Sequence, residues 1–358
     1  MLRVLFIILF FNCSFARSQN NAWISSLHWS ADNKLLYSTS YDSSIRIWSV
    51  QNGALINTLH TDQLVMTGNL SSDGKRLAAH LFEGNMELWD MVNRKKIATA
   101  SIHRSGNFGS WFSADSKTIL TGSIDGDDQL TISLWNANTG ELIDKSVTYT
   151  ITNYAVSPDA KRYLTLSAAN HVIVWDGISL KPLQDRLFEK DSIRQIAISH
   201  DDASFGVLTR QGIKLYNMKT MDSIAMISAG DQPIRSFSFD PGNKFIVTIA
   251  YNGDINCWNK VSGKRAFSLG NYDKQDYGWL ARVVYDKNGK RLAVSYGTNK
   301  VSVWDIKQKK KIMEVQGDKH LVLPSFNKNG DKLLLSEGYN GISTWHINTG
   351  KKWKVYHQ

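Results

Sequence analysis

The chain has 358 residues, of which 42% are hydrophobic and 21% charged, and its 42 lysines and arginines outnumber its 32 acidic residues, giving a net charge of +10. This composition is that of a globular protein and excludes an intrinsically disordered chain. With two cysteines in this length, it also excludes a small fold that depends on a disulfide framework.

The first sixteen residues differ in character from the rest. The chain starts with the basic segment Met1-Leu2-Arg3, continues with an unbroken apolar run from Val4 to Phe11, and then has small residues in Ser14-Phe15-Ala16. The apolar run is too short to span a bilayer, and this order of segments predicts a secretory signal peptide over residues 1–16. We therefore expect an exported protein of bacterial type, periplasmic or secreted, with one domain over residues 17–358.

The N-terminal segment allows two alternatives. It can be a tail that is disordered or packed on the domain, or Cys13 can be the acylated cysteine of a lipoprotein, although Asn12 before it fits that signal poorly. Cleavage after Ala16 would leave Cys257 as the remaining cysteine, which excludes an intramolecular disulfide. Cys257 directly precedes Trp258 in an expected strand, so we expect an inert, packed thiol.

A hairpin unit is repeated along the chain. In residues 286–307 a polar turn leads into the run Leu292-Ala293-Val294-Ser295, and a second run, Val301-Ser302-Val303-Trp304, follows a glycine-containing turn. Short alternating runs of this kind predict two strands. The aromatic residue that ends the second run recurs every 40 to 46 residues. The eight markers are Trp48, Trp89, Trp135, Trp175, Tyr216, Trp258, Trp304 and Trp345. Self-similarity at this period predicts a repeat architecture.

Each unit divides into four strands, which we designate a, b, c and d in chain order. In the first unit we expect them at Ile24–Trp29, Leu35–Ser40, Ile45–Trp48 and Ala54–Leu59. In the last unit we expect them at Leu321–Phe326, Leu333–Ser336, Ile342–Trp345 and Trp353–His357. All eight units contain the four parts, although Tyr216 replaces Trp in the fifth.

The units resemble the WD40 repeat family. The Trp-Asp dipeptide is present at Trp89-Asp90, Trp175-Asp176 and Trp304-Asp305, and the family's turn before the hairpin is present as Ser157-Pro158-Asp159. The resemblance covers Trp23 to Gln358. It implies an all-β fold, namely a WD40-like β-propeller, and a platform for binding other proteins. The eight aromatic markers and the complete first and last units predict eight four-stranded blades. Seven blades are the alternative if the fifth unit fails to form. Because neither end has a spare strand, we expect blade 8 to pack against blade 1 to close the ring.

Antiparallel order sorts the connections into two faces. We call the face with the a–b and c–d turns the turn face, and the face with the d–a and b–c loops the loop face. The turn face is rich in cations, among them Arg94, Lys95, Lys96, Lys309, Lys310 and Lys311. Such a face suits a polyanion or an anionic envelope surface. The alternative is that these side chains are solvated and keep the protein soluble, because acidic residues stand beside several of them.

The loop face has a pattern of aromatic residues. Counting seven residues on from Lys34, Lys75, Lys244 and Lys332 reaches Tyr41, Phe82, Tyr251 and Tyr339. In the family that the chain resembles, this loop position commonly contacts partners, and Tyr and Arg are frequent in binding hot spots. The same count reaches Arg210 in the fifth unit, and the segments before strand a add Arg194, Arg235 and Trp279. These eight residues are the predicted partner-binding site; the alternative is that the rings pack between blades.

The sequence has no convincing catalytic or metal-binding motif. The acidic loop Asp125–Asp128 lacks the spacing of an EF-hand, and the nine histidines lack zinc-ligand spacing. Nucleophile-elbow, metalloprotease and phosphate-loop motifs are absent. We therefore expect a non-enzymatic scaffold with a protein partner and with no cofactor, metal, nucleic acid or membrane span after signal removal. Two alternatives are a polyanion or envelope-surface binder that uses the turn face, and an enzyme with a site on the propeller axis.

Overall fold

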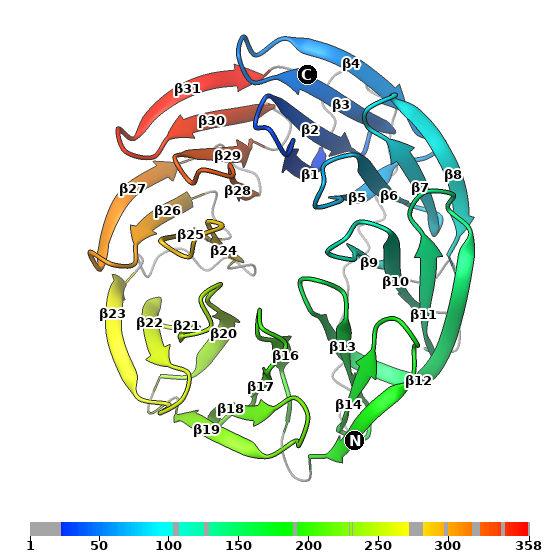
Figure 1. Ribbon diagram of the computed structural model, residues 1–358. Helices are drawn as coiled ribbons and strands as arrows, with labels where there is room; N and C mark the ends of the chain where they lie inside the picture. The colour runs from blue at the N-terminus through cyan, green and yellow to red at the C-terminus, as the bar shows by residue number, and fades with distance from the viewer. Residues whose placement is uncertain are drawn as a thin grey trace, which may run out of the picture.

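The computed structural model is a ring of β-sheets (Figure 1). It describes residues 23–102, 107–124, 129–188, 192–228, 230, 232–271, 282–296, 300–316, 323–337 and 341–356. Within these ranges the regular elements are strands joined by antiparallel pairing, and no helix is long and apolar enough to cross a membrane. The expected eight-bladed β-propeller is confirmed. The expected signal peptide lies outside the described residues and stays a prediction.

Each blade has four strands, with strand a nearest the axis and strand d on the outer rim (Figure 1). Blades 1 and 2 comprise β1 (Ile24–Trp29), β2 (Leu35–Ser40), β3 (Ser44–Ser49), β4 (Leu55–His60), β5 (Val65–Leu70), β6 (Arg76–Leu81), β7 (Asn85–Asp90) and β8 (Lys95–Ser101). Blades 3 and 4 comprise β9 (Asn107–Phe112), β10 (Thr118–Ile124), β11 (Gln129–Asn136), β12 (Leu142–Val156), β13 (Arg162–Ser167), β14 (His171–Asp176) and β15 (Pro182–Leu187).

The second half of the ring follows the same plan. Blades 5 and 6 comprise β16 (Gln195–Ile198), β17 (Ser204–Leu208), β18 (Gly212–Asn217), β19 (Ser223–Ser228), β20 (Ile234–Phe239), β21 (Phe245–Ala250), β22 (Asp254–Asn259) and β23 (Arg265–Asn271). Blades 7 and 8 comprise β24 (Arg282–Tyr285), β25 (Arg291–Tyr296), β26 (Lys300–Asp305), β27 (Lys310–Gln316), β28 (Pro324–Phe326), β29 (Lys332–Ser336), β30 (Ile342–His346) and β31 (Lys351–Tyr356).

Two features of the ring differ from a plain repeat. β12 is one strand of 15 residues that pairs with β11 at one end and with β13 at the other, so it supplies strand d of blade 3 and strand a of blade 4. The fifth unit forms a complete blade even though Tyr216 replaces Trp. The Tyr216 ring stacks on Phe205 with a centroid distance of 5.3 Å, and the guanidinium of Arg186 lies 5.0 Å from the Tyr216 ring centroid. These contacts fill the place of the missing indole.

The core consists of eight apolar clusters, and each lies between two neighbouring blades. The cluster between blades 8 and 1 closes the ring. Here Trp48 meets Tyr356 edge-on with a centroid distance of 5.9 Å, and the Trp29 indole donates a hydrogen bond to the carbonyl of Ser325 over 3.3 Å. Among the described strands none crosses into the sheet of the other end, so the expected closure by face packing is confirmed.

The repeated Trp is buried and anchored by a hydrogen bond in most blades. Its indole N–H donates to a hydroxyl of the adjacent strand b over 2.8–2.9 Å. The pairs are Trp48 with Ser38, Trp135 with Thr121, Trp175 with Thr165, and Trp258 with Thr248. A buried donor that lacks a partner costs free energy, so this pairing explains why Trp recurs together with a hydroxyl.

Three blades depart from that pairing. In blade 2 the strand-b position is Ala79, and the Trp89 indole donates instead to the buried carboxylate of Glu87 over 3.0 Å. In blade 8 the Trp345 indole donates to Ser343 over 2.9 Å. In blade 7 the position is Val294, and the Trp304 indole has no hydrogen-bond partner in the part of the chain that the structure describes.

Candidate protein-binding faces

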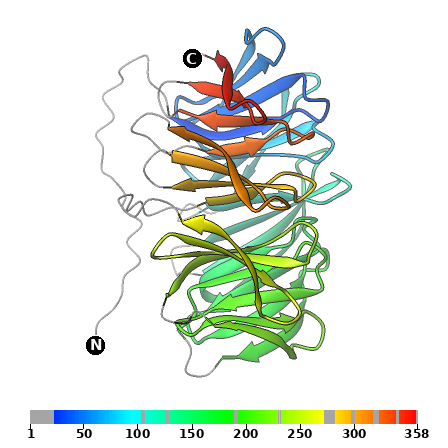
Figure 2. The same ribbon diagram turned by 90° about the vertical axis from the view of Figure 1, so that its left-hand side faces the viewer.

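The two faces of the disc are distinct when the ring is seen edge-on (Figure 2). Strand a runs from the loop face to the turn face, and each later strand reverses direction. The predicted partner-binding residues therefore belong to the loop face. The first residue after strand b donates its backbone N–H to the residue before strand a over 2.9–3.1 Å. These pairs are Tyr41 with Trp23, Phe82 with Leu64 and Tyr251 with Pro233.

The three aromatic side chains occupy equivalent backbone positions but differ in exposure. Phe82 is 56% exposed and Tyr251 is 59% exposed. Tyr41 is half-buried, and burial raises the pKa of its hydroxyl. An exposed ring at a fixed backbone position has apolar area available for a partner. Phe82 and Tyr251 therefore fit the partner-binding hypothesis better than Tyr41, which also fits the packing alternative.

A β-bulge near the start of strand a adds a second side chain to this rim. The register of β5 with β6 skips Met66, and that of β20 with β21 skips Arg235. A bulge turns its extra residue away from the regular alternation, and bulges are frequent at functional rims. Met66 is exposed and follows Val65, the residue that pairs with Leu81 just before Phe82. In the same way, Arg235 follows Ile234, the residue that pairs with Ala250 just before Tyr251. Sequence analysis had no signal for Met66, because only the register reveals the bulge.

Of the remaining predicted residues of this site, the structure describes only some. Arg194 and Arg210 of blade 5 are exposed. Trp279 and Tyr339 lie outside the described residues. The register also changes the count in blade 8: Lys332 pairs with His346, as Leu35 pairs with Ser49, so Lys332 is equivalent to Leu35 and not to Lys34. The position in blade 8 that matches Tyr41 is therefore Gly338, and Tyr339 follows it.

Most acidic residues of the turn face accept hydrogen bonds that hold the turns in shape. In five a–b turns a serine hydroxyl donates to the aspartate two residues later over 2.6–2.8 Å. The aspartates are Asp32, Asp73, Asp115, Asp159 and Asp201. In every blade the residue after this position has a positive φ near +60°. This left-handed backbone conformation costs free energy for a residue other than glycine. These acids are structural, which supports part of the solubilising interpretation of the face.

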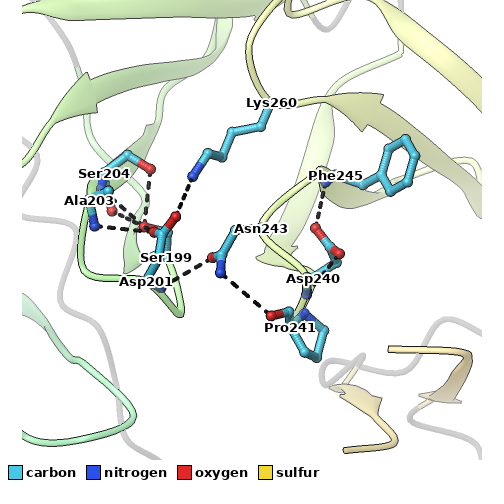
Figure 3. A network of polar contacts seen from close by, with 10 residues as sticks. Ser199, Asp201, Ala203, Ser204, Asp240, Pro241, Asn243, Phe245 and Lys260 are labelled. Carbon is cyan, nitrogen blue, oxygen red and sulfur yellow. Dashed lines mark hydrogen bonds and ion pairs between the residues drawn. The ribbon is translucent and has the colours of Figure 1, made fainter. Parts of the chain in front are cut away.

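Some cations of the turn face are likewise held by ion pairs within the protein. Figure 3 shows Lys260 of blade 6 reaching Asp201 of blade 5 over 3.3 Å, and the Lys260 side chain is only 12% exposed. In the same network the Asn243 side chain accepts a hydrogen bond from the Asp201 backbone N–H over 3.2 Å, and Asp240 accepts one from that of Phe245. This network joins the two turns, so Lys260 stabilises a blade interface and is not available to a ligand.

The predicted basic residues divide in the same way. Arg94, Lys95, Lys96, Lys309, Lys310 and Lys311 are all exposed. Lys96 nevertheless binds the buried carboxylate of Glu87 over 3.0 Å and Asp62 over 2.8 Å. Lys311 pairs with Glu314 over 2.6 Å. The hydrogen bonds that Lys96 donates to these carboxylates raise its pKa, and the bond to Asp62 contributes most. Sequence analysis did not identify Glu87 as the group that holds Lys96.

The described residues contain no group of three or more His, Cys, Asp and Glu side chains that could hold a metal ion. The acidic loop Asp125–Asp128 lies outside them. A cavity of about 220 Å³ between blades 6 and 7 is lined by Asp240, Cys257 and Tyr285 among others. Burial raises the pKa of the Cys257 thiol to about 12, and the Asp240 carboxylate adds to this. The thiol is therefore protonated and packed, as expected, and provides no nucleophile.

Comparison with known proteins agrees with this geometry. The family model for the WD domain, G-beta repeat, matches residues 12–49. Autophagy-related protein 16 of Arabidopsis thaliana is 22% identical over 63% of this chain and 45% of that protein. Serine-threonine kinase receptor-associated protein of Dictyostelium discoideum is 21% identical over 73% of this chain and 80% of that protein.

A third relative is matched over a shorter stretch. SIR4-interacting protein SIF2 of Saccharomyces cerevisiae is 31% identical over 27% of this chain and 17% of that protein. The match thus spans less than half of the plant and yeast relatives. The ring of eight four-stranded antiparallel blades makes this chain an eight-bladed β-propeller, and its first repeat is similar to the WD domain.

Proposed function

We propose that the protein is a non-enzymatic scaffold that binds another protein through its loop face. The observation that carries the proposal is the exposure of Phe82 and Tyr251, each more than half exposed at the same backbone position of a rigid ring. Aromatic rings on fixed positions contribute large contact area at low entropic cost. Two relatives support the class of function by name, because one is a receptor-associated protein and one a SIR4-interacting protein.

The surroundings of the two rings suggest how they act. Blade 2 has two exposed apolar side chains on this rim, Met66 and Phe82, and the neighbouring blade 1 has Tyr41 at the backbone position equivalent to Phe82. In blade 6, the pairing of Ile234 with Ala250 brings the strand ends that carry the bulge residue Arg235 and the exposed Tyr251 together, so this rim has both a cation and an aromatic residue. Buried hot spots in interfaces combine aromatic and Arg side chains in this way. The site we propose therefore has an apolar part on blades 1 and 2 and an amphipathic part on blade 6.

The test is the double substitution Phe82→Ala with Tyr251→Ala, assayed for melting temperature and for capture of a partner isolated with the wild-type protein. Truncation of a hot-spot aromatic costs about 2 kcal/mol or more in binding. We expect lost capture and an almost unchanged melting temperature, because both rings are largely exposed.

The matched control is Val92→Ala with Val261→Ala, which also removes exposed apolar groups but from the turn face. It should capture the partner as the wild type does. Equal capture by both variants would contradict the proposal, and a large fall in melting temperature of the first variant would show that its rings pack in the fold.

Export is a separate proposal, supported by the sequence of residues 1–16 alone. We expect the mature protein to begin at Arg17, and N-terminal sequencing of the protein isolated from outside the cytoplasm checks this. Intact Met1 on a cytoplasmic protein would contradict it.

A further inference from the structure

The c–d turns and outer strands of blades 6–8 hold far more positive charge than those of blades 3–5. We define the basic sector as the c–d turns and outer strands of blades 6–8, residues 259–271, 305–316 and 346–356. Against two acidic residues, Asp305 and Glu314, it holds Lys260, Lys264, Arg265, Lys307, Lys309, Lys310, Lys311, Lys351, Lys352 and Lys354. The equivalent segments of blades 3–5, residues 136–150, 176–187 and 217–228, are the neutral sector. They hold Lys145, Lys181, Arg186 and Lys219 against Glu141, Asp144, Asp176, Asp185 and Asp222.

The cations of the basic sector repeat in register. The strand-d residue that pairs with the marker Trp is Arg265 in blade 6, Lys311 in blade 7 and Lys352 in blade 8. Each follows another cation in the sequence, and the outer strands β23, β27 and β31 form one continuous arc of the rim (Figure 1). Strand d begins at the turn face, so the three cation pairs lie at one level along its edge.

Three of these ten cations, Lys260, Lys311 and Lys352, bind a carboxylate, but five exposed ones do not. Lys264, Arg265, Lys307, Lys310 and Lys351 are exposed, and none forms a salt bridge with any residue that the structure describes. Like charges held close together repel one another, and an external anionic surface relieves that repulsion. The basic sector is therefore complementary to a surface with many negative charges.

The turn face also presents apolar tips. Val92, Ile178 and Val261 occupy the same position of the c–d turn in blades 2, 4 and 6 and are 65%, 66% and 73% exposed. The side chain of the Asp or Asn that opens each turn accepts the backbone N–H of the tip residue over 2.9–3.1 Å. These hydrogen bonds fix the turn, so the tips project from it in one arrangement. Val261 also follows Lys260 and precedes Lys264, inside the basic sector.

We propose that the turn face docks on an anionic lipid bilayer. In this arrangement the basic sector contacts the negatively charged headgroups, and Val92, Ile178 and Val261 enter the interfacial layer. The apolar tips favour a bilayer over a soluble polyanion, because a polyanion has no apolar region to receive them, whereas an interface accepts both kinds of side chain. Docking by this face leaves the loop face free for a protein partner.

The experiment uses the full chain and sedimentation with vesicles of phosphatidylcholine alone or with about one-third phosphatidylglycerol. Heparin serves as the soluble polyanion. We expect binding to the anionic vesicles that weakens as salt is raised, and little binding to neutral vesicles. The variant Lys264→Gln, Arg265→Gln, Lys310→Gln should lower vesicle partitioning about 100-fold, because each cation near the surface contributes about fivefold.

Two further variants make the test specific. The matched control Lys145→Gln, Lys181→Gln, Lys219→Gln removes the same number of charges from the neutral sector and should leave vesicle binding within about twofold. The variant Ile178→Ser with Val261→Ser should lose vesicle binding while it keeps any heparin binding. Circular dichroism of each variant checks that the exposed substitutions leave the fold intact.

Three outcomes would overturn the proposal. Heparin binding without vesicle binding would make the sector a polyanion site. Equal binding to neutral and anionic vesicles would remove the role of the cations. An equal loss in the neutral-sector control would show that net charge, and not its position, determines binding.

Discussion

Blades 6–8 and blades 3–5 share one backbone plan and differ in what they present at the rim. In both sectors the inner strands are packed between neighbouring blades, and strand d faces outward. The residue opposite the marker aromatic is a cation in blades 6, 7 and 8, but Leu142, Pro182 and Ser223 in blades 3, 4 and 5. The outer strands of blades 3–5 instead expose Leu142, Ile143, Val147, Leu183, Leu187, Ile224 and Met226. A repeat thus constrains its core in every blade, while rim positions are free to diverge by sector.

The same two sectors differ once inside the core. Trp175 of blade 4 donates its indole N–H to Thr165 over 2.8 Å, whereas the Trp304 indole of blade 7 faces Val294 and has no partner among the described residues. Both indoles are buried to a similar extent. The pair is therefore a natural comparison of an anchored and an unanchored marker.

The largest expected effect is on the free energy of unfolding when the marker residues Trp175 and Trp304 are substituted. Trp175→Phe and Trp304→Phe remove the same volume, but the first also leaves the buried hydroxyl of Thr165 without its hydrogen-bond donor, which costs about 1–3 kcal/mol. We expect Trp175→Phe to lower the free energy of unfolding by about 2 kcal/mol more than Trp304→Phe. Denaturant unfolding of both variants checks this, and equal losses would show that the indole hydrogen bond contributes nothing.

The second prediction transfers the rim pattern between sectors. Leu142→Lys with Ser223→Lys, added to the Lys264→Gln, Arg265→Gln, Lys310→Gln variant, places cations opposite the markers of blades 3 and 5. If position opposite the marker is what matters, about 2 kcal/mol of binding to anionic vesicles should return. Vesicle sedimentation measures it. No recovery would mean that the neighbouring blades of the basic sector are required as a unit.

The third prediction supplies the missing anchor of blade 7. Val294→Thr should place a hydroxyl where Thr165 stands in blade 4, within reach of the Trp304 indole. Val→Thr in a core normally destabilises, yet here the new hydrogen bond satisfies a buried donor, and we expect a gain of about 1 kcal/mol. The matched control is Val207→Thr in blade 5, where the marker is Tyr216 and no indole is available. A loss of stability in both variants would contradict the account.

Sequence was sufficient for the blade count because burial constrains the repeat. The spacing of the aromatic markers predicts eight units, and each strand of the first unit was located within one residue of its observed bounds. The fusion of two strands into β12 was not predicted, since residues 142–156 have no turn signal and no marker of where one blade ends. Strand ends at the loops are set by hydrogen bonds between distant segments, which a local pattern does not contain.

The sites were predictable only in part. The sequence order assigns the cations to the turn face, but their excess in blades 6–8 over blades 3–5 and the pairing of Lys96 with Glu87 depend on which blades are neighbours and which acids are within reach. Counting from the turn lysines reached Tyr41, Phe82 and Tyr251, yet it began one residue late in blade 8, because Lys332 pairs in β29 as the first strand residue. Exposure of Phe82 and Tyr251, as against the half-buried Tyr41, has no signal in the sequence.

The smallest expected effect concerns a partly buried charge in the a–b turn of blade 5. Burial, followed by the nearby Asp159 carboxylate, raises the pKa of Asp202 to about 6. Between pH about 4 and 6 the folded protein therefore retains a proton that the unfolded chain has released, so stability falls as pH rises through this window. Because Asp202 is partly exposed, we expect Asp202→Asn to gain only on the order of 1 kcal/mol at pH 7.

This gain should vanish at low pH, where Asp202 is protonated in both states. Asn is also well tolerated at this left-handed position, where φ is 54°. Thermal unfolding at several pH values checks the prediction. A gain that is independent of pH would show that carboxylate repulsion is not the cause.

The most direct measurement of the central claim is site-specific photocrosslinking in an extract of the source compartment. A photoreactive phenylalanine analogue at position 251 probes the loop face, and the same group at position 261 probes the turn face; both positions are more than half exposed. The account predicts a crosslinked protein of defined mass at position 251 that is absent at position 261. A protein crosslink at position 261 with none at position 251 would contradict the assignment of the partner-binding site to the loop face.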